Sequence, residues 1–326
     1  MIFIESDSRD PYFNLALEEY VFEKLDPSQT YFMLWQNKNT IVVGKYQNTA
    51  EEINQDFVDS HGIRVVRRLS GGGAVYHDDG NLNFTFIVHK ELNPDYNFNL
   101  FVIPVIKALE ELGVHAEFNG RNDITIDGKK FSGNSQYARK GRIMHHGCIM
   151  LDSDLGKVQG ALKVKAAKFE SKSIKSVRSR VTTINANAPR RISMEEFKEA
   201  LKKQAFANND MELYKLTEED QAQVRKLAED KYSTWEWNYG FYPEYSIRRE
   251  QKFESGLITI QMEVEHGIIR EIRIAGDFFG NMDIRELESM LKGLPLDEHL
   301  EDKLSAMNLE DYMHGITAAD LAGLLR

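Results

Sequence analysis

The sequence is poor in the features that mark secreted, zinc-binding and membrane proteins. It has one cysteine, Cys148, among 326 residues, so no disulfide can form within the chain. Structural zinc sites use several cysteine or histidine ligands, and a lone cysteine argues against one. No hydrophobic run approaches the ~18 residues of a membrane-spanning helix, and no basic segment followed by an apolar one opens the chain. We therefore expect a protein of the reducing cytoplasm.

An excess of positive charge is also missing from the chain as a whole. Lys and Arg number 41 against 51 Asp and Glu, a net charge of −10, which argues against a general nucleic-acid binder. The exception is the basic island, residues 157–191, with ten basic residues and one acidic residue, Glu170. Such an island suits an anionic ligand or partner, but also a solvated loop that binds nothing. Charge alone leaves both interpretations open.

The pattern along the chain predicts two domains. Asp10-Pro11 is typical of a helix start, and residues 98–112 also fit a helix. β-branched and aromatic content predicts strands at 31–36, 40–44, 63–68, 83–88 and 143–151. Asp127-Gly128 and His266-Gly267 predict hairpin turns. After residue 245 two strands precede two helices, so we expect a large domain over 1–245 and a small α+β domain over 246–326.

Three consecutive glycines, Gly71 to Gly73, form the most unusual segment of the sequence. Glycine runs have a high entropic cost and no packing value, so they suit places where backbone approaches a ligand closely. Their N–H groups can hold an anion, and Arg68 adds a charge beside them. The segment is neither a Walker motif nor a G-x-G-x-x-G turn. The alternative is an unliganded hairpin turn, which the flanking Arg67-Arg68, His77 and Asn81 make less attractive.

Two lysines enter the strand that follows Asp127-Gly128. Strand alternation directs Lys129 and Lys130 to opposite faces, so one of them can point inward. An inward lysine needs an anionic partner, because an isolated buried charge is costly. A phosphate or carboxylate ligand would supply that partner. The alternative is a solvated edge strand protected by lysines.

Three further side chains allow more than one interpretation. His145 and His146 are adjacent on a predicted strand, face opposite ways and cannot readily share a metal ion. Asp123 suits a magnesium ion held mainly by substrate phosphates, since magnesium keeps few protein ligands. Cys148 lies within an apolar strand, where a small buried hydrophobe is commoner than a nucleophile.

Taken together, these motifs resemble the lipoate–protein ligase A family. The segments that carry the resemblance are DPYFNLALEEY (10–20), RRLSGGGAVYHDDGN (67–81), GRNDITIDGKKFSG (120–133), HHGCIMLDSDL (145–155) and SIKSVRSRVTTI (173–184). The resemblance implies an α+β fold: a biotin-ligase-like catalytic domain with central mixed β-sheets flanked by helices, and a small C-terminal accessory domain. It implies ATP and Mg²⁺ as cofactors and lipoic acid as substrate. Free lipoate, or octanoate, would become lipoyl-AMP with release of pyrophosphate.

The resemblance also implies the site residues. Lys130 matches the catalytic lysine, and Asp123 the position near the metal. The residues expected around the lipoyl-adenylate are Arg68, Ser70, Gly71, Gly72, Gly73, Ala74, Val75, Tyr76, His77, Asn81, Asn122, Asp123, Ser135, His146 and Cys148. Those expected in the lipoate pocket are Leu15, Leu17, Glu18 and Trp35. Lys172, Lys175, Arg178 and Arg180 match a basic region of the family.

The implied partners are apo lipoyl domains of 2-oxoacid dehydrogenase E2 subunits and the glycine-cleavage H protein, with a monomer as the default state. Neither nucleic acid nor membrane is expected. The main rival is a lipoyl or octanoyl transferase that uses Cys148 as an acyl-thioester nucleophile and needs no ATP. A biotin ligase and a non-catalytic lipoate carrier are weaker rivals. Exchange of ATP with pyrophosphate that depends on free lipoate separates the four classes.

Overall fold

The computed structural model describes residues 1–163, 180–207, 210–239 and 247–326. Residues 164–179 of the basic island, with Lys172, Lys175 and Arg178, lie outside the described residues. Within the described residues, no helix is both long and apolar enough to cross a membrane.

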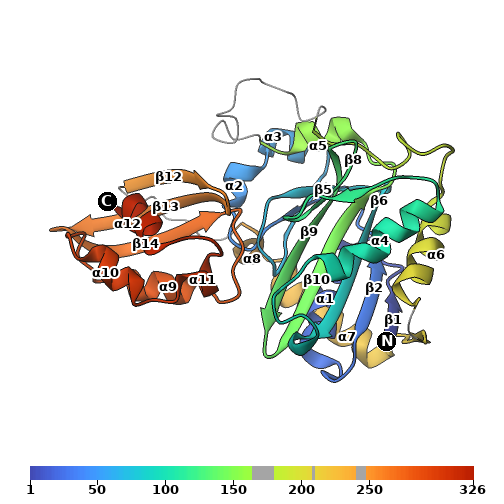
Figure 1. Ribbon diagram of the computed structural model, residues 1–326, viewed down its shortest axis with the longest axis horizontal. Coiled ribbons are helices and arrows are strands. Elements are labelled where there is room, and N and C mark those ends of the chain that lie inside the picture. The colour runs from blue at the N-terminus through green and yellow to red at the C-terminus, as the bar shows by residue number, and fades with distance from the viewer. Residues whose placement is uncertain (164–179, 208–209, 240–246) are drawn as a thin grey trace.

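A mixed sheet of eight strands forms the larger part of the molecule (Figure 1). Its strand order is β11-β1-β2-β6-β10-β9-β8-β7. β1 pairs in parallel with β2 and β11, and the other neighbours pair antiparallel. The strands are β1 (Ile2–Glu5), β2 (Tyr31–Trp35), β6 (Asn81–His89), β7 (Glu117–Phe118), β8 (Asp123–Ile126), β9 (Lys129–Arg139), β10 (Arg142–Met150) and β11 (Glu212–Leu213).

Helices cover both faces of this sheet, and strand alternation explains how. On β2, Phe32 and Leu34 pack into a core with α4 (Asn99–Glu111) and α6 (Met194–Ala205), whereas Met33 and Trp35 face α1 (Pro11–Lys24) and α7 (Glu218–Leu227). The helix α1 starts as expected, because the Asp10 side chain accepts a hydrogen bond from the backbone of Tyr12 (3.0 Å). The short elements η1 (Lys90–Leu92) and η4 (Ala228–Tyr232) complete this region.

A smaller sheet packs on the α1 side. It has the order β4-β3-β5, with β3 (Thr40–Val43) parallel to β4 (Arg64–Arg67) and antiparallel to β5 (Val75–His77). The glycine run therefore does not close a hairpin, since both flanking strands pair with β3. The outer face is covered by α3 (Gln55–Ser60) and α5 (Leu155–Ala161), with α2 (Thr49–Glu52) just before α3 in the chain and α8 (Trp235–Asn238) beside β4.

The C-terminal segment builds its own layer of strands and helices, at the left of Figure 1. The antiparallel strands β12 (Ile247–Phe253), β13 (Gly256–Glu265) and β14 (Ile268–Gly276) carry α9 (Ile284–Leu291), α10 (Leu300–Ser305), α11 (Leu309–Tyr312) and α12 (Ala318–Leu325). Its buried core comes from residues after 246, with Tyr46 as the one addition among those described.

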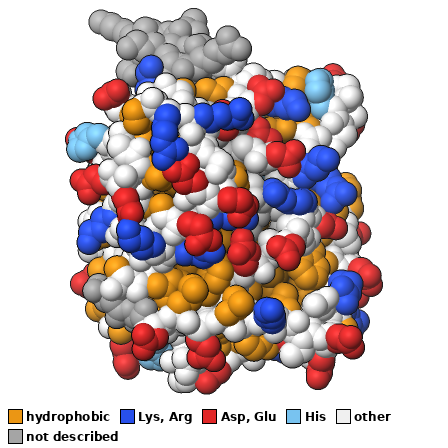
Figure 2. Space-filling model, turned by 90° about the vertical axis from the view of Figure 1, so that its right-hand side faces the viewer, with side chains coloured by type: hydrophobic (Ala, Val, Ile, Leu, Met, Phe, Trp, Pro, Cys, Tyr) orange, Lys and Arg blue, Asp and Glu red, His pale blue; other side chains and the backbone are white. Residues whose placement is uncertain are grey.

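The large sheet ends at a strand of two residues, β11. Leu213 in this strand and Met211 just before it are more than half exposed. Figure 2 shows hydrophobic side chains gathered between charged ones in the lower part of this side of the molecule. A short edge strand gives a second chain few backbone groups to pair with.

Candidate functional site

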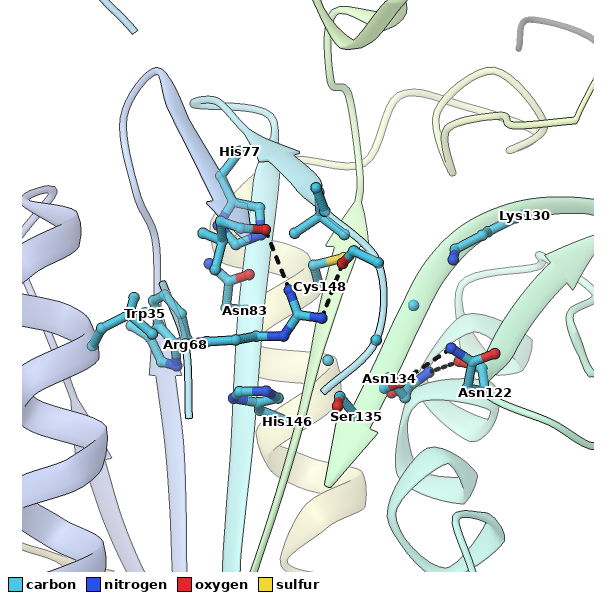
Figure 3. A pocket seen from close by; sticks show the side chains of 18 residues that line it. Trp35, Arg68, His77, Asn83, Asn122, Lys130, Asn134, Ser135, His146 and Cys148 are labelled. Atoms are coloured by element: carbon cyan, nitrogen blue, oxygen red, sulfur yellow. Dashed lines mark hydrogen bonds between the residues drawn. The ribbon is translucent and has the colours of Figure 1, made fainter. Parts of the chain in front are cut away.

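One cavity lies between the glycine run and the hairpin that carries Lys130 (Figure 3). Its walls come from α1, β2, β3, β5, β6, β9 and β10 and from the loop after β4. The expected site residues that line it are Leu15, Trp35, Arg68, Gly72, Gly73, Ala74, Val75, His77, Asn122, Lys130, Ser135, His146 and Cys148. Segments far apart in the sequence therefore meet around one space.

Arg68 holds the glycine run in shape from inside. Its guanidinium donates to the carbonyl oxygens of Gly71 (2.6 Å), Gly73 (2.9 Å) and Val42 (3.2 Å). Burial lowers the pKa of Arg68 to about 10, while Cys148 and Glu18 act to raise it, so the side chain stays charged at neutral pH. Most of its donors are used by the loop, so Arg68 shapes the ligand-facing backbone more than it offers free N–H groups.

The C-terminal segment touches the same loop. The backbone N–H of Gly72 donates to the carbonyl oxygen of Phe278 (3.3 Å). Gly72 has φ +89°, and a Cβ added there would lie 3.1 Å from both Arg68 Nη2 and the ring of Phe279. Glycine is thus required at this position by its conformation and by its neighbours.

Lys130 stands on the opposite wall, paired with Asp123. The ammonium Nζ lies 2.6 Å from Asp123 Oδ1, and the two side chains are 33% and 24% exposed. Lys129 is exposed. The expected division between an inward and an outward lysine is confirmed, and the anionic partner in the protein itself is Asp123.

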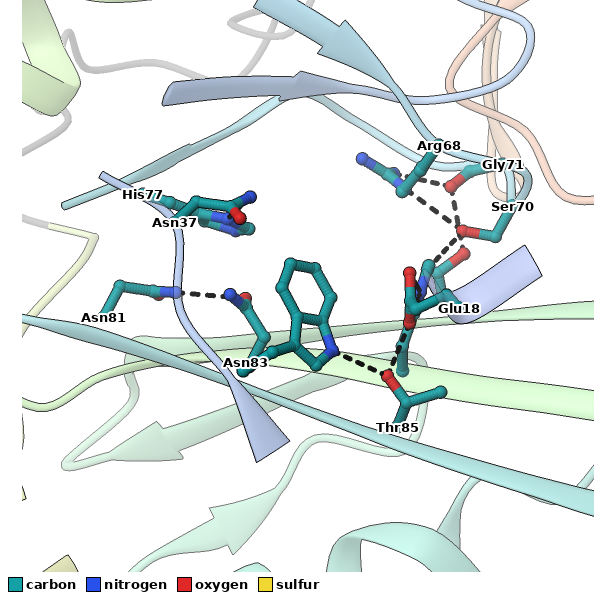
Figure 4. A network of polar contacts seen from close by, with 12 residues as sticks. Glu18, Asn37, Arg68, Ser70, Gly71, His77, Asn81, Asn83 and Thr85 are labelled. Carbon is teal, nitrogen blue, oxygen red and sulfur yellow. Dashed lines mark hydrogen bonds and ion pairs between the residues drawn. The ribbon is translucent and has the colours of Figure 1, made fainter. Parts of the chain in front are cut away.

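A line of buried hydrogen bonds supports the cavity from beneath (Figure 4). Arg68 Nε donates to Ser70 Oγ (3.1 Å), which lies 2.5 Å from His146 Nε2. On its other side His146 Nδ1 lies 3.0 Å from a Glu18 carboxylate oxygen, so the carboxylate places the ring proton on Nδ1 and Ser70 donates to Nε2.

The Glu18 carboxylate also connects this line of hydrogen bonds to Trp35, one of the residues expected in the lipoate pocket. Thr85 Oγ1 donates to Glu18 (2.5 Å) and accepts from Trp35 Nε1 (3.0 Å). Glu18 is 1% exposed. Buried networks with every member satisfied hold their side chains in one arrangement, so Glu18 fixes cavity-lining groups from a position outside the lining.

The remaining expected residues lie near the cavity but outside its lining. Glu18 and Ser70 belong to the supporting line, and Gly71 accepts from Ser135 Oγ (3.0 Å). Tyr76 lies on the other face of β5, where its hydroxyl donates to Asn39 (2.7 Å). Leu17 is part of the buried core, Asn81 donates to Asn83 (3.0 Å), and Asp123 is paired with Lys130.

Five lining residues were not expected: Val42, Asn83, Gly133, Asn134 and Gly147. Asn83 could have been predicted from the sequence, because Asn81, Asn83 and Thr85 alternate along one strand and so share a face. In the sheet Asn83 lies opposite Cys148. Gly147 could not have been predicted, because its role depends on a contact with a side chain of the neighbouring strand. A Cβ there would lie 2.4 Å from Asn134 Oδ1.

The two adjacent histidines face different surroundings, as strand alternation predicts. His146 joins the polar line, whereas His145 stacks on Phe101 with ring centroids 4.6 Å apart. Burial lowers the pKa of His145 well below its usual value, and His146 adds to the effect. Among the described residues, no group of three or more His, Cys, Asp or Glu side chains could hold a metal ion.

The fold and the cavity define an α+β protein whose glycine-rich loop and lysine hairpin enclose one pocket suited to an anionic ligand. The chain belongs to the lipoyl protein ligase A/B family. The model described as "Lipoyl protein ligase A/B catalytic domain" matches residues 10–206, and "Bacterial lipoate protein ligase C-terminus" matches residues 242–325.

Curated relatives match the whole chain. Lipoate–protein ligase 1 of Staphylococcus aureus is 48% identical and Lipoate-protein ligase LplJ of Bacillus subtilis is 46% identical, each with 100% of both chains covered.

Three solved structures are also similar. LipL1 of P. falciparum in complex with lipoate has a TM-score of 0.76 at 24% identity, covering 94% of this chain and 93% of that one. A lipoate-protein ligase A bound with ATP has a TM-score of 0.63 at 26% identity, covering 74% of this chain and 98% of that one. A structure described as "A bi-partite lipoate protein ligase and its E2 lipoyl domain from Thermoplasma acidophilum" has a TM-score of 0.66 at 28% identity, covering 76% of this chain and 98% of that one.

Proposed function

We propose that this chain is an ATP-dependent lipoate–protein ligase. It activates free lipoate, or octanoate, to the acyl-adenylate with release of pyrophosphate, and then transfers the acyl group to a lysine of an acceptor protein. The observation that carries the proposal is that Lys130 and the Gly72–Gly73 backbone line the same cavity. Family membership and the relatives named lipoate–protein ligase support the substrate.

The first step brings two anions together, because a carboxylate oxygen attacks the α-phosphorus of ATP and pyrophosphate leaves. Such a step depends on positioning and on neutralising charge. Lys130 supplies a compact cation, and the loop amides supply oriented N–H groups. The apolar wall formed by Leu15, Trp35 and Val42 is suited to the hydrocarbon part of lipoate.

In the second step an acceptor amine attacks the acyl carbon and AMP leaves. The developing charge on the carbonyl oxygen needs a nearby donor, a role that Lys130 can fill again. Arg68 keeps the glycine loop over the ligand, where it also protects the reactive anhydride from water.

The residues present fit a magnesium ion that arrives with the nucleotide. Magnesium typically binds one or two carboxylates and substrate phosphates, and Asp123 is the carboxylate beside the cavity. When bound, the ion would neutralise phosphate charge, with Asp123 as its protein ligand. Lys130 would then be released from its 2.6 Å pairing with Asp123 to face the substrate.

The acceptors that we propose are apo lipoyl domains of 2-oxoacid dehydrogenase E2 subunits and the glycine-cleavage H protein. The archaeal ligase, described together with its E2 lipoyl domain, supports the first. The basic island, net +9 over residues 157–191, would attract acidic acceptor surfaces. We further propose that the protein is a monomer in the cytoplasm. Its catalytic domain would cover residues 1–245 and its accessory domain residues 246–326. The residues that line the cavity would form its active site.

Exchange of radiolabelled pyrophosphate into ATP tests the proposed function. We expect exchange that needs both this protein and free lipoate, and transfer of the acyl group to a lipoyl domain but not to one whose acceptor lysine is replaced by Arg. A transferase with Cys148 as nucleophile would show no exchange and would form a thioester. Under the proposal, Cys148→Ala keeps measurable exchange, since the thiol forms no covalent intermediate.

A further inference from the structure

A row of buried amides leads from the start of α1 to the cavity wall. Asn14 is 1% exposed, and its Nδ2 donates to the backbone carbonyl oxygens of Ser8 and Gln36, each at 2.9 Å. Carbonyl oxygens only accept, so they fix which end of the amide is nitrogen. The Asn14 Oδ1 correspondingly accepts from Ser6 Oγ (2.7 Å).

The amide of Asn14 orients the amide of Asn37, which in turn determines whether His77 Nδ1 donates or accepts. Asn14 Nδ2 also lies 3.0 Å from Asn37 Oδ1, so its two N–H groups are shared among three oxygens. With its oxygen toward this nitrogen, Asn37 directs its own nitrogen toward His77 Nδ1 at 3.3 Å. An amide N–H opposite Nδ1 requires that Nδ1 accept. A neutral imidazole that accepts at Nδ1 carries its proton on Nε2.

His77 Nε2 has no hydrogen-bond partner within the part of the chain that the structure describes. The side chain is 3% exposed and lines the cavity, beside Asn83 (Figures 3 and 4). Asn83 on the same wall is 1% exposed, and its side-chain amide is bonded to that of Asn81 (3.0 Å). A buried ring N–H without an acceptor on a cavity wall indicates a ligand that brings the acceptor, since unsatisfied buried donors are costly.

We propose that Asn37, oriented by Asn14, is a positioning residue that fixes His77 as an Nε2–H donor to an anionic oxygen of the bound carboxylate or phosphoryl group. Only the identity of that ligand rests on the proposed function. The charged or titratable groups that face the ring are Arg68, next to the glycine run, and His146 of β10, with Cys148 of β10 in the same cavity.

These surroundings keep the imidazole neutral. Burial, together with the nearby Arg68 and His146, lowers the pKa of His77 to about 3. A neutral ring at every working pH gives a donor whose strength does not vary with pH. The ring also meets the Trp35 indole edge to face, with centroids 6.2 Å apart, which limits its rotation.

The first test reads the tautomer directly by two-bond 1H–15N NMR of the full chain labelled on its histidines, with His77 assigned from the His77→Gln spectrum. We expect His77 protonated at Nε2 and not at Nδ1 from pH 5 to pH 8. Lipoate alone or ATP with Mg²⁺ should shift its Nε2–H signal, and the two arms identify which oxygen it contacts. A proton on Nδ1, or a signal that neither probe moves, would overturn the proposal.

The second test changes the tautomer. In Asn37→Asp a carboxylate oxygen faces Nδ1 and draws the proton there, so neutral His77 can no longer donate from Nε2. Losing one hydrogen bond to a charged oxygen predicts a fall in kcat/KM of about 10- to 100-fold at pH 8. Partial recovery is expected at lower pH, because the introduced carboxylate favours the imidazolium, which carries a proton on both ring nitrogens.

The matched control is Asn54→Asp, the same chemical change at the exposed N-cap of α3, where Asp caps as well as Asn. It should keep the wild-type rate and pH profile. An equal loss at all pH values in Asn37→Asp would contradict the positioning role. Because the tautomer is measured without turnover, a wild-type chain that lacks lipoate-dependent exchange would reject the proposed function while leaving the donor intact.

Discussion

At the scale of single residues, Lys130 and Lys129 are neighbours with different surroundings. Lys130 faces Asp123 and the cavity, whereas Lys129 is exposed. We expect Lys130→Gln to lower the rate of adenylate formation on the order of 100-fold, the usual effect of removing one stabilising donor. Lys129→Gln should leave it unchanged. Single-turnover formation of lipoyl-AMP measures both, with circular dichroism to show that each variant folds. A Lys130→Gln rate near wild type would contradict the role.

Residue types and spacing predicted most of the polar groups that line the cavity but not those that orient them. Lys130 and the glycine run stand out in the sequence because a buried charge and a run of glycines both destabilise the folded state unless a ligand compensates. Asn14 and Asn37 do not, since asparagines near a helix start or between strands read as caps and turns. Their role exists only after α1 and the loop following β2 meet at His77.

At the scale of elements, the glycine run predicts a contrast between two neighbouring substitutions. Gly72→Ala places a side chain at φ +89° against Arg68 and Phe279, and should lower the free energy of unfolding by about 1–2 kcal/mol. Gly73 has no atom within 4 Å of an added Cβ, so Gly73→Ala should not destabilise the fold. Urea denaturation compares them, and equal losses would mean that the loop is not held by these contacts.

Some elements could be predicted from a few neighbouring residues, whereas others depend on pairing between distant strands. The Asp127-Gly128 turn is confirmed, with φ of 48° and 71°, because its chemistry is contained in two residues. The strand β12 was missed, since IRREQKF is mostly exposed and shows no apolar alternation. The pairing of β4 and β5 on either side of β3 was also hidden, because the strand between them comes earlier in the chain.

At the scale of the whole molecule, buried neutral histidines make stability depend on pH. The pKa of His77 is lowered to about 3 and that of His145 well below its usual value, chiefly by burial. The unfolded chain therefore binds more protons below about pH 6.5, so stability falls as pH falls through this range, by up to about 1.4 kcal/mol per pH unit for each histidine.

Urea denaturation at pH 7 and pH 5 measures this dependence. His145→Gln should make the slope with pH smaller, whatever it does to stability itself. His115→Gln, at an exposed position, should leave the slope as it is. A stability that is flat between the two pH values would show that the buried rings are protonated in the folded protein.

A crystal structure of the full chain with bound lipoyl-adenylate would show whether Lys130 and the glycine run converge on one nucleotide-linked acyl group. We predict Lys130 Nζ within hydrogen-bond distance of an adenylate oxygen, with the Gly72–Gly73 backbone against the same ligand. An adenylate bound elsewhere, or a Lys130 amine directed into bulk solvent while the site is filled, would show that the two segments do not share this ligand.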